Sequence, residues 1–170
     1  MQKSEVIKIL KKDGVGVMPT DTLYGLVGSA FSKKAIARIY KLKGRDADKK
    51  LIVLISKISD LEKFGIRHSH ILKNVGMLKK FWPGKVSIII GGTAFRLPKK
   101  KSLIEILNKT GPLVAPSANL QGMSPAKNIK QAKKYFNTQV DFYVSGGTLV
   151  GKPSHLIEIR KDGSISVLRD

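Results

Sequence analysis

The sequence predicts a single α/β domain, residues 1–170, in which helices flank a twisted sheet of mixed parallel and antiparallel strands. Apolar runs of strand length alternate along the chain with segments whose apolar residues recur at the helical period. No repeat, low-complexity tract or linker interrupts them, and 170 residues suffice for one full core. The last two predicted strands are joined by a tight turn, so we expect that end of the sheet to be antiparallel.

The first half of the chain is predicted from its capping residues and apolar runs. Ser and Thr cap helices, Gly ends them, and Pro terminates strands because it cannot donate a ladder hydrogen bond. The expected elements are a helix capped by Ser4 and ended by Gly14, a strand at 15–18 stopped by Pro19, a hydroxyl-rich loop at 20–26, a helix capped by Ser32 and ended by Gly44, and a strand at 51–55.

The second half alternates in the same way. Gly91-Gly92 and Lys161-Asp162-Gly163 are hairpin signals. The expected elements are helical segments at about 59–64 and 69–81, a turn at 82–84, strands at 86–90 and 93–97, a helix at about 102–108, a strand at 113–115, a helix at about 129–136, a strand near 142–144, and paired strands at 156–159 and 164–168.

The chain is strongly basic. It has 32 Lys and Arg against 12 Asp and Glu, which gives a formal charge of +20. Residues 63–104 contain no Asp or Glu at all. This imbalance predicts attraction to a polyanion, either nucleic acid or a multiply charged small molecule such as ATP. A lysine-rich surface that is only solvated explains the same charge. The charge therefore indicates a class of partner and not a function.

Several kinds of site are unsupported by the sequence. There is no cysteine, so disulfide and thiolate chemistry are absent. His68, His70 and His155 lack metal-ligand spacing, and we expect no protein-held metal. Residues 146–152 approach a phosphate-binding loop, but Pro153 replaces the magnesium-binding hydroxyl. No apolar run is long enough to span a membrane and no signal peptide is evident, so we expect a cytoplasmic protein.

Two short motifs carry candidate ligand groups. Pro116 should end the strand at 113–115 and deliver Ser117 and Asn119 into a loop at the sheet edge, where open α/β sheets bind ligands. An Asx or Ser turn, in which these side chains bond only their own backbone, explains the two residues equally well. Lys43 and Arg45 flank the helix-ending Gly44. They suit phosphate oxygens, or else they complement the helix dipole.

Taken together, five motifs in order resemble the YrdC/TsaC family of L-threonylcarbamoyladenylate synthases. They are Pro19-Thr-Asp-Thr-Leu-Tyr-Gly-Leu26, Lys43-x-Arg45, Trp82-Pro-Gly84, Arg96-x-Pro98 and Ser117-x-Asn119. The resemblance extends from about Gly14 to Arg169. It implies a YrdC-like fold and a nucleotidyltransferase that forms threonylcarbamoyl-AMP and pyrophosphate from L-threonine, bicarbonate or CO₂, and ATP, with Mg²⁺ bound through the phosphates.

The family also implies partners. Its product serves the threonylcarbamoyladenosine modification of tRNA, so the resemblance implies tRNA or other RNA and a downstream threonylcarbamoyl transferase complex as partners. It implies no membrane partner.

The resemblance assigns roles to individual residues. Lys43 and Arg45 are the expected catalytic pair that holds the ATP phosphates. The expected ATP-binding set is completed by Lys49, Ser117, Asn119 and Arg169. The expected threonine-binding set is Thr22, Arg96, Ala115 and Ser154, with Arg96 on the threonine carboxylate.

Three features depart from the family pattern. Asp46 replaces the usual proline after Lys43-x-Arg45, and Leu54 stands where several relatives have a histidine. The segment between Ile90 and Arg96 is shortened to about a turn, with Gly92 where a threonine is common.

Two other functions fit parts of the sequence. One is a non-enzymatic RNA-binding protein of tRNA or ribosome maturation on the same fold, which explains the charge but not the retained Thr22, Arg96, Ser117 and Asn119. The other is a carbamoyl-adenylating relative that uses carbamoyl phosphate.

Overall fold

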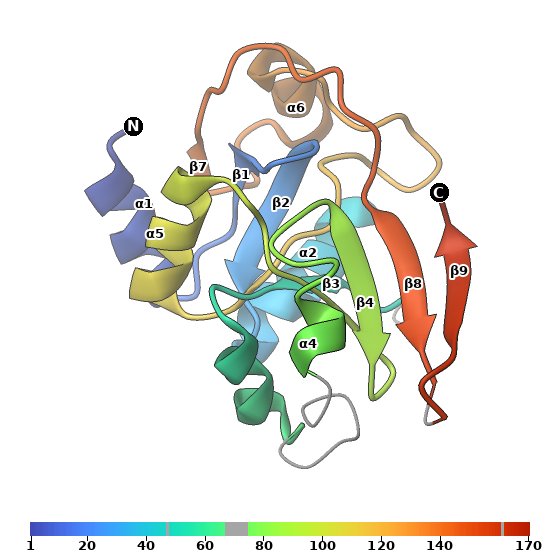
Figure 1. Cartoon of the computed structure of the whole chain (residues 1–170). Helices are drawn as coiled ribbons and strands as arrows, with labels where there is room; N and C mark the ends of the chain where they lie inside the picture. Colours follow the sequence, from blue (N-terminus) through green and yellow to red (C-terminus); the bar gives the residue numbers. More distant parts are fainter. Residues whose placement is uncertain (47, 67–74, 161) are drawn as a thin grey trace.

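The structure, a computed structural model, describes the chain except for residues 47, 67–74 and 161. The described strands form one nine-stranded sheet in the order β7-β1-β2-β6-β3-β5-β4-β8-β9 (Figure 1). They are β1 (Gly16–Pro19), β2 (Tyr24–Ser29), β3 (Ile52–Leu54), β4 (Val86–Ile90), β5 (Thr93–Arg96), β6 (Leu113–Val114), β7 (Phe142–Tyr143), β8 (His155–Ile159) and β9 (Ile165–Arg169). β1 and β7, β3 and β5, and β4 and β8 pair in parallel. The other pairs are antiparallel, so the predicted mixed sheet is confirmed.

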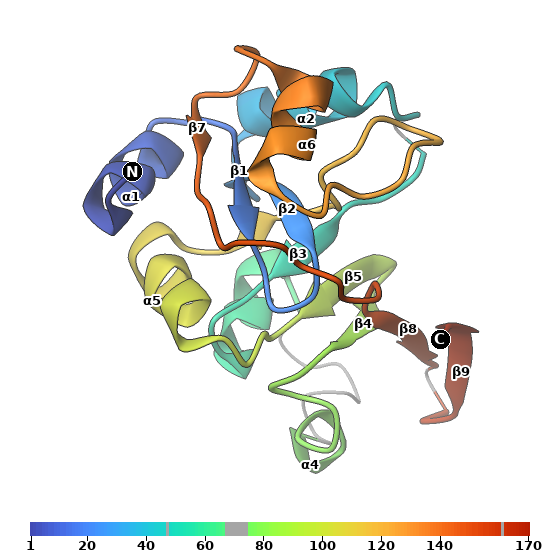
Figure 2. The ribbon, with the colours of Figure 1, turned by 90° about the horizontal axis from the view of Figure 1, so that it is seen from above.

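Helices cover both faces of the sheet. They are α1 (Lys3–Lys11), α2 (Lys33–Lys43), the 3₁₀ helix η1 (Ile58–Phe64), α4 (Val75–Leu78), α5 (Lys101–Thr110) and α6 (Ile129–Phe136). Figures 1 and 2 show α1 and α5 side by side, with α2 and α6 in other parts of the molecule. Of the helices within the described ranges, none is long and apolar enough to cross a membrane.

Two hydrophobic cores explain why the central strands are apolar without alternation. Val53 and Val114 join the core that packs against α2 and α6, whereas Leu54 and Leu113 join the core beneath α1 and α5. Successive side chains of a strand point to opposite faces, so a strand covered on both sides needs apolar residues at every position. This double burial holds the short strands β3 and β6 in the middle of the sheet.

The helix ends agree with prediction at α2 and differ at α1. Ser32 caps α2, since its hydroxyl accepts from the amide of Ala35, and Gly44 ends it in the left-handed conformation at φ 58°. The prediction for α1 was wrong at both ends. The helix begins after Gln2, whose amide donates to Glu5 Oε2 at 2.9 Å, and it ends at Lys11, three residues before Gly14.

The main error of sequence reasoning is the loop expected at 20–26. The segment from Tyr24 to Ser29 is the strand β2, and it forms a hairpin with β1 in which Pro19 faces Tyr24. The loop proper is therefore only Thr20 to Leu23. Two glycines within β2 weaken its strand signal, but the pairing partners on both sides, β1 and β6, determine the strand.

Most other predicted elements are confirmed within a few residues. The strand at 86–90, the helix at 129–136 and the antiparallel pairs β4–β5 and β8–β9 occur as expected, although residue 161 of the second turn lies outside the described residues. The segment at 59–64 is a 3₁₀ helix and begins one residue earlier. Part of the helix expected at 69–81 lies outside the described residues, and α4 occupies the described part from Val75 to Leu78.

Asp141, directly before β7, connects the sheet to α2. Its Oδ2 accepts from the amide of Val15 at 2.7 Å, and its Oδ1 accepts from Nη2 of Arg38 at 3.0 Å. Burial by itself would raise the pKa of Asp141, but the bonds from Arg38 and Val15 outweigh it and lower that pKa below its ordinary value.

We therefore expect Asp141→Asn to lower the free energy of unfolding by about 1 kcal/mol at neutral pH, a value reduced for solvent screening. Because the folded pKa is below the unfolded one, this advantage of the natural chain is full above the unfolded pKa and is lost as pH falls through the folded pKa. Urea unfolding of both proteins across the acid range measures it. Asp13→Asn is the matched control, since Asp13 has no ion pair among the described residues. A pH-independent difference for Asp141→Asn would contradict the linkage.

Candidate functional site

A small cavity of about 70 Å³ lies where the ends of several strands converge. Polar side chains from the β1–β2 loop, β5, the segment after β6 and the two ends of the β8–β9 hairpin meet there, over a floor that includes Ile52 of β3. The residues that line it are Thr20, Thr22, Leu23, Tyr24, Gly25, Ile52, Arg96, Ala115, Ser117, Pro153, Ser154 and Arg169.

The loop between β1 and β2 presents Thr22 in a fixed orientation. The hydroxyl of Thr20 donates to the carbonyl of Leu23 at 2.7 Å and lies 3.3 Å from the amides of Thr22 and Leu23. These bonds between the Thr20 hydroxyl and the backbone fix the turn. The Thr22 hydroxyl then accepts from Nη1 of Arg96 at 3.2 Å. Thr20 therefore orders the loop, while Thr22 faces the cavity beside a guanidinium.

Arg96 is a buried cation with incomplete bonding. Its Nη2 lies 2.8 Å from Oδ1 of Asp21, and both side chains are more than nine-tenths buried. Asp21 Oδ1 and Oδ2 and Arg96 Nε nevertheless have no hydrogen-bond partner within the described part of the chain. Burial lowers the pKa of Arg96, Asp21 opposes this shift, and Arg169 adds to it. Arg96 lines the small cavity, so its guanidinium is placed beside any anion bound there.

Ser154 is held from two sides. Its hydroxyl lies 2.9 Å from that of Ser87 on β4, and both serines are buried. Arg169 of β9 donates two hydrogen bonds to the Ser154 carbonyl, from Nε at 3.0 Å and from Nη2 at 2.7 Å. These contacts fix the start of β8 against the end of β9, so that both Ser154 and Arg169 face the small cavity.

A larger cavity of about 370 Å³ adjoins the small one and shares Ile52, Ser117 and Arg169 with it. Its charged lining is Arg45, Lys50 and Arg169 against Asp48, an excess of two positive charges. The Nε of Arg45 donates to the carbonyl of Lys49 at 3.0 Å, and its Nη2 donates to that of Lys50 at 3.2 Å. The two cavities therefore place a small polar pocket beside a cationic one, with Ser117 and Arg169 at the junction.

Lys43 is not at the cavity surface but beneath the loop at 117–121. It is 2% exposed, and its ammonium donates to the carbonyls of Ser117 and Asn119 at 2.6 and 2.8 Å and to Asn119 Oδ1 at 3.2 Å. Burial, aided by the charge of Arg45, lowers the pKa of Lys43 to about 8. The side chain of Lys43 therefore turns inward beneath this loop and lines neither cavity.

The segment 144–153 crosses the β1–β2 loop as an extended strap, visible in Figure 2 between β7 and β8. The buried hydroxyl of Tyr24 accepts from the amide of Gly146 and donates to the carbonyl of Gly147, both at 2.8 Å. A Cβ built on Gly151 would lie 2.2 Å from the carbonyl oxygen of Thr22. This segment is neither helical nor a phosphate-binding loop, and its Pro153 lines the small cavity.

The structure divides the residues that the resemblance singles out. All four of the expected threonine set line the small cavity, and Ser117 and Arg169 line both cavities. Arg45 lines the larger one. Lys43, Lys49 and Asn119 line neither, and Lys49 instead lies 3.4 Å from Asp46 at the surface.

The departures from the family pattern have clear places in the structure. Asp46 faces Lys49 outside the larger cavity, so its charge is partly compensated. Leu54 is fully buried in the core under α1 and α5. Gly92 lines the larger cavity next to the ammonium of Lys50, in the shortened hairpin between β4 and β5.

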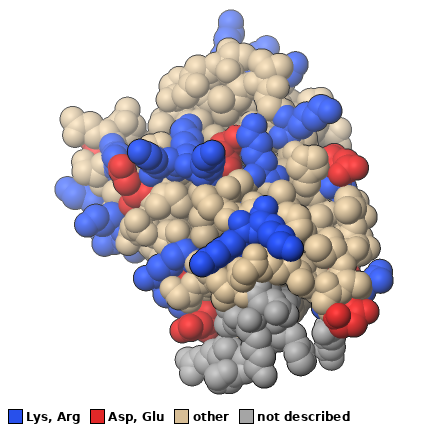
Figure 3. All heavy atoms as spheres, viewed as in Figure 1, with Lys and Arg blue, Asp and Glu red and all other residues tan. Residues whose placement is uncertain are grey.

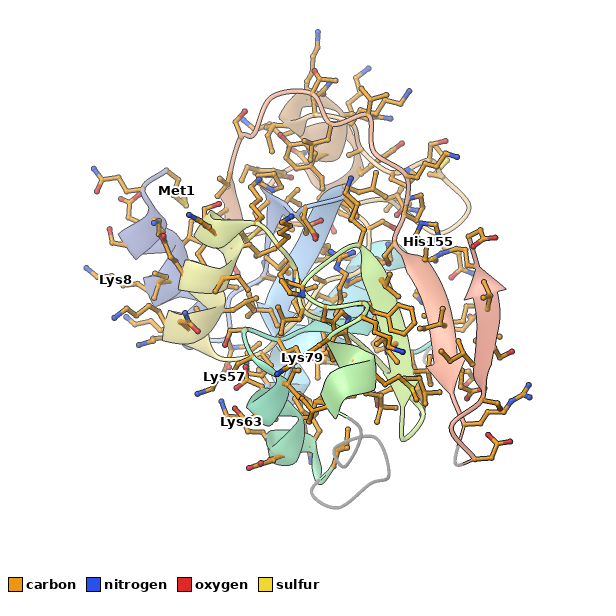
Figure 4. The ribbon with its side chains drawn as sticks, in the orientation of Figure 1. Met1, Lys8, Lys57, Lys63, Lys79 and His155 are labelled. Atoms are coloured by element: carbon orange, nitrogen blue, oxygen red, sulfur yellow. The ribbon has the colours of Figure 1, made fainter. Side chains whose placement is uncertain are left out.

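Histidines do not contribute to either cavity in the parts that the structure covers. His68 and His70 lie outside the described residues. His155, at the start of β8, lies 3.4 Å from Asp170, near the carboxyl end of β9 (Figure 4). The described residues contain no group of three or more His, Cys, Asp or Glu that could hold a metal ion.

Sequence reasoning missed four residues that shape the site. Thr20 and Asp21 belong to the same hydroxyl-rich loop as Thr22, and their motif was an available signal. Lys50 directly follows Lys49, which the family resemblance assigns to ATP binding. Ser87 carries no sequence signal, since only the alignment of β4 with β8 brings it to Ser154.

A protein-family comparison decides the relationship. The Sua5/YciO/YrdC family model, described as "Telomere recombination", matches residues 8–170. The chain belongs to the Sua5/YciO/YrdC family. Its matched region contains every residue that lines the two cavities.

Individual members of the Sua5/YciO/YrdC family are similar along most of the chain. A threonylcarbamoyl-AMP synthase of Cellvibrio japonicus is 30% identical over 169 residues, which cover 89% of this chain and 86% of that protein. A threonylcarbamoyl-AMP synthase of Bacillus subtilis is 29% identical over 178 residues, and this chain spans 51% of its length. The crystal structure of P. abyssi Sua5 complexed with L-threonine has a TM-score of 0.84 at 26% identity. It covers 98% of this chain, which spans 53% of that one.

The strap gives a test of the site's packing. We expect Gly151→Ala to lower the free energy of unfolding by about 1–3 kcal/mol, because the added methyl group would overlap the Thr22 carbonyl. Urea unfolding measures this. Gly76→Ala is the control, since a Cβ there meets nothing within 4 Å. Equal stability of the two variants would show that the strap does not press on the β1–β2 loop.

Proposed function

We propose that the protein is a nucleotidyltransferase, an L-threonylcarbamoyladenylate synthase that joins L-threonine, bicarbonate or CO₂, and ATP. The observation that carries the proposal is the pair of adjoining cavities. The small one offers hydroxyls and a buried guanidinium for an amino acid, and the larger one offers Arg45, Lys50 and Arg169 for phosphates. The names of the Cellvibrio and Bacillus relatives and the threonine in the Pyrococcus structure support it.

The small cavity fits the functional groups of threonine. Arg96, with an unpartnered buried Nε, supplies the forked cation that suits the carboxylate. Thr22 and Ser154 supply hydroxyls for the threonine hydroxyl, and Ala115 supplies an apolar wall. A site that bonds the substrate hydroxyl rejects analogues that lack it, because its own polar groups would then be left unpaired.

The reaction needs two anions brought together more than it needs a strong base. Carboxylation of the threonine amine gives a carbamate, whose oxygen bonds to the α-phosphorus of ATP while the bond to the departing pyrophosphate breaks. Ser117 and Arg169 lie at the junction of the cavities, where these groups would meet. Their role there is alignment and charge neutralisation, which are the main sources of catalysis in such transfers.

Magnesium enters this proposal with the nucleotide. Asp48 is the one acidic residue that lines either cavity within the described part of the chain. A single carboxylate is not a protein-built site, so Mg²⁺ would be bound chiefly by the phosphate oxygens of ATP. When bound, it would neutralise charge on the phosphates, and Arg45 and Lys50 would hold the complex.

The charge of +20 is the basis for proposing RNA partners. Figure 3 shows Lys and Arg spread across one face with acidic residues isolated among them, and Figure 4 shows Lys8, Lys57 and Lys63 pointing outward. Such a surface suits the phosphate backbone of tRNA. We propose that the product is delivered to a threonylcarbamoyl transferase complex that acts on tRNA.

The reaction itself is tested by its co-substrate requirement. We expect pyrophosphate release from ATP to require both threonine and bicarbonate, since the nucleophile is formed from the two. A coupled pyrophosphate assay with each component omitted in turn measures this, with carbamoyl phosphate replacing bicarbonate as a control. Equal release without threonine would rule out the synthase, and release driven by carbamoyl phosphate would favour a carbamoyl-adenylating enzyme.

The role of Arg96 is tested with Arg96→Lys, which keeps a cation beside Asp21 and so avoids an uncompensated buried carboxylate. Lysine lacks the fork, so we expect threonine affinity to fall about tenfold while ATP affinity is unchanged. Calorimetric titration with each ligand measures both. Arg38→Lys, at the surface ion pair with Asp141, is the matched control. A variant that loses ATP and keeps threonine would reverse the assignment of the two cavities.

A further inference from the structure

The Lys43-x-Arg45 and Ser117-x-Asn119 motifs each place one residue at the larger cavity and one away from it. Arg45 and Ser117 line the cavity, whereas Lys43 and Asn119 do not. The four side chains are therefore not equivalent, although the resemblance assigns all four to ATP. The reason lies in the bonds that Lys43 and Asn119 already make.

The ammonium of Lys43 has three N–H groups, and three acceptors lie within bonding distance. These are the carbonyls of Ser117 and Asn119, at 2.6 and 2.8 Å, and Asn119 Oδ1, at 3.2 Å. A phosphate oxygen could bond this ammonium only by displacing one of them. Displacement would leave a buried carbonyl or amide oxygen unpaired, which costs about 1–3 kcal/mol.

The side chain of Asn119 is saturated in the same way. Its Nδ2 donates to the carbonyls of Leu120 and Met123 at 2.9 and 2.7 Å, which uses both N–H groups. Its Oδ1 accepts from the hydroxyl of Ser117 at 2.6 Å in addition to Lys43. Asn119 therefore bonds its own loop and Lys43, and presents no free donor to a ligand.

Backbone bonds continue this connection between α2 and the loop. The amide of Gln121 donates to the carbonyl of Lys43 at 2.7 Å, and Ala118, fully buried, bonds Tyr24 and Ala126 through its amide and carbonyl. The end of α2 thus holds the loop by both backbone and side chain. The loop carries Ser117, which is the residue that reaches the junction of the two cavities.

Arg45 differs from Lys43 in all these respects. It is half-buried at the cavity wall, and its two recorded side-chain bonds, to the carbonyls of Lys49 and Lys50, use two of five N–H groups. Lys50 and Arg169 are the other cations that line this cavity among the described residues. Arg45, Lys50 and Arg169 therefore line the larger cavity as cations, and Arg45 keeps N–H groups that no recorded bond uses.

We propose that Lys43 and Asn119 are positioning residues that hold the loop at 117–121 and make no phosphate contact. The triphosphate is met instead by Arg45, Lys50 and Arg169, while Ser117, whose hydroxyl donates to Asn119, forms part of the cavity wall. The identity of the nucleotide in this inference rests on the proposed function. The positioning role of Lys43 and Asn119 does not depend on it. Lys50, one residue beyond the expected Lys49, becomes a ligand-binding residue.

The test compares Lys43→Met with Arg45→Met in the full chain, since each removes one positive charge. Inorganic tripolyphosphate is the probe, because it binds without threonine or turnover. Lys43→Met should lower the urea midpoint of unfolding and keep the tripolyphosphate dissociation constant within about threefold. Arg45→Met should keep the midpoint and weaken tripolyphosphate about tenfold or more, the loss expected for one charge-assisted bond. Lys50→Met should resemble Arg45→Met, and Lys49→Met should change neither quantity.

Asn119→Ala provides a second arm, which decides the matter if Lys43→Met does not fold. It should also lower the midpoint and spare tripolyphosphate binding. The double variant should be less destabilised than the sum of the two single changes, since the residues share one set of bonds. Lys43→Met or Asn119→Ala that weakens tripolyphosphate as Arg45→Met does, at an unchanged midpoint, would overturn the proposal. Failure to release pyrophosphate from ATP would refute the proposed function but leave this comparison intact.

Discussion

The site depends on the insertion of the two-residue strand β6 between β2 and β3. Leu113 and Val114 pair with Ser29 and Gly28 on one side and with Leu54 and Val53 on the other. Past the strand the pairing continues, as Pro116 accepts from Leu26 and Ala115 donates to Ile52. Because each of these bonds fixes register, the loop at 117–121 emerges directly beside the β1–β2 loop. Two segments almost a hundred residues apart thereby form the walls of one cavity.

Burial of charge is the second constraint on the site. Arg96 and Asp21 are both more than nine-tenths buried, and they pair with incomplete hydrogen bonding. Such a pair costs desolvation energy that attraction only partly offsets, so it is weak evidence of stabilisation. It is consistent with a site kept ready for an anion, since the guanidinium also has an unpartnered Nε among the described residues. Lys43 is the contrasting case, a buried cation whose donors are all used within the protein.

Close backbone packing is the third constraint. The strap at 144–153 reaches the β1–β2 loop at Gly151, where any side chain would overlap the Thr22 carbonyl, and Tyr24 binds the strap at Gly146 and Gly147. The near match of this segment to a phosphate-binding loop comes from glycines that serve this contact. Glycine here permits close approach, which is a different use from cradling a phosphate.

By itself, the sequence determined the alternation of elements, the mixed sheet and the hairpins, because hydrophobic period and turn residues act over short distances. Through the family resemblance it also singled out Thr22, Arg96, Ala115 and Ser154, all of which line the small cavity. Tertiary structure decided the rest. β2 exists because β1 and β6 pair with it, and Ser87 meets Ser154 only through the register of β4 and β8.

Whether a cation faces a ligand or the protein interior was likewise decided by the tertiary structure. Lys43 and Arg45 are two residues apart and alike in charge, yet Lys43 turns beneath a loop that is distant in the sequence, whereas Arg45 lines a cavity. Local sequence cannot separate them, because the acceptors that capture Lys43 lie more than seventy residues away.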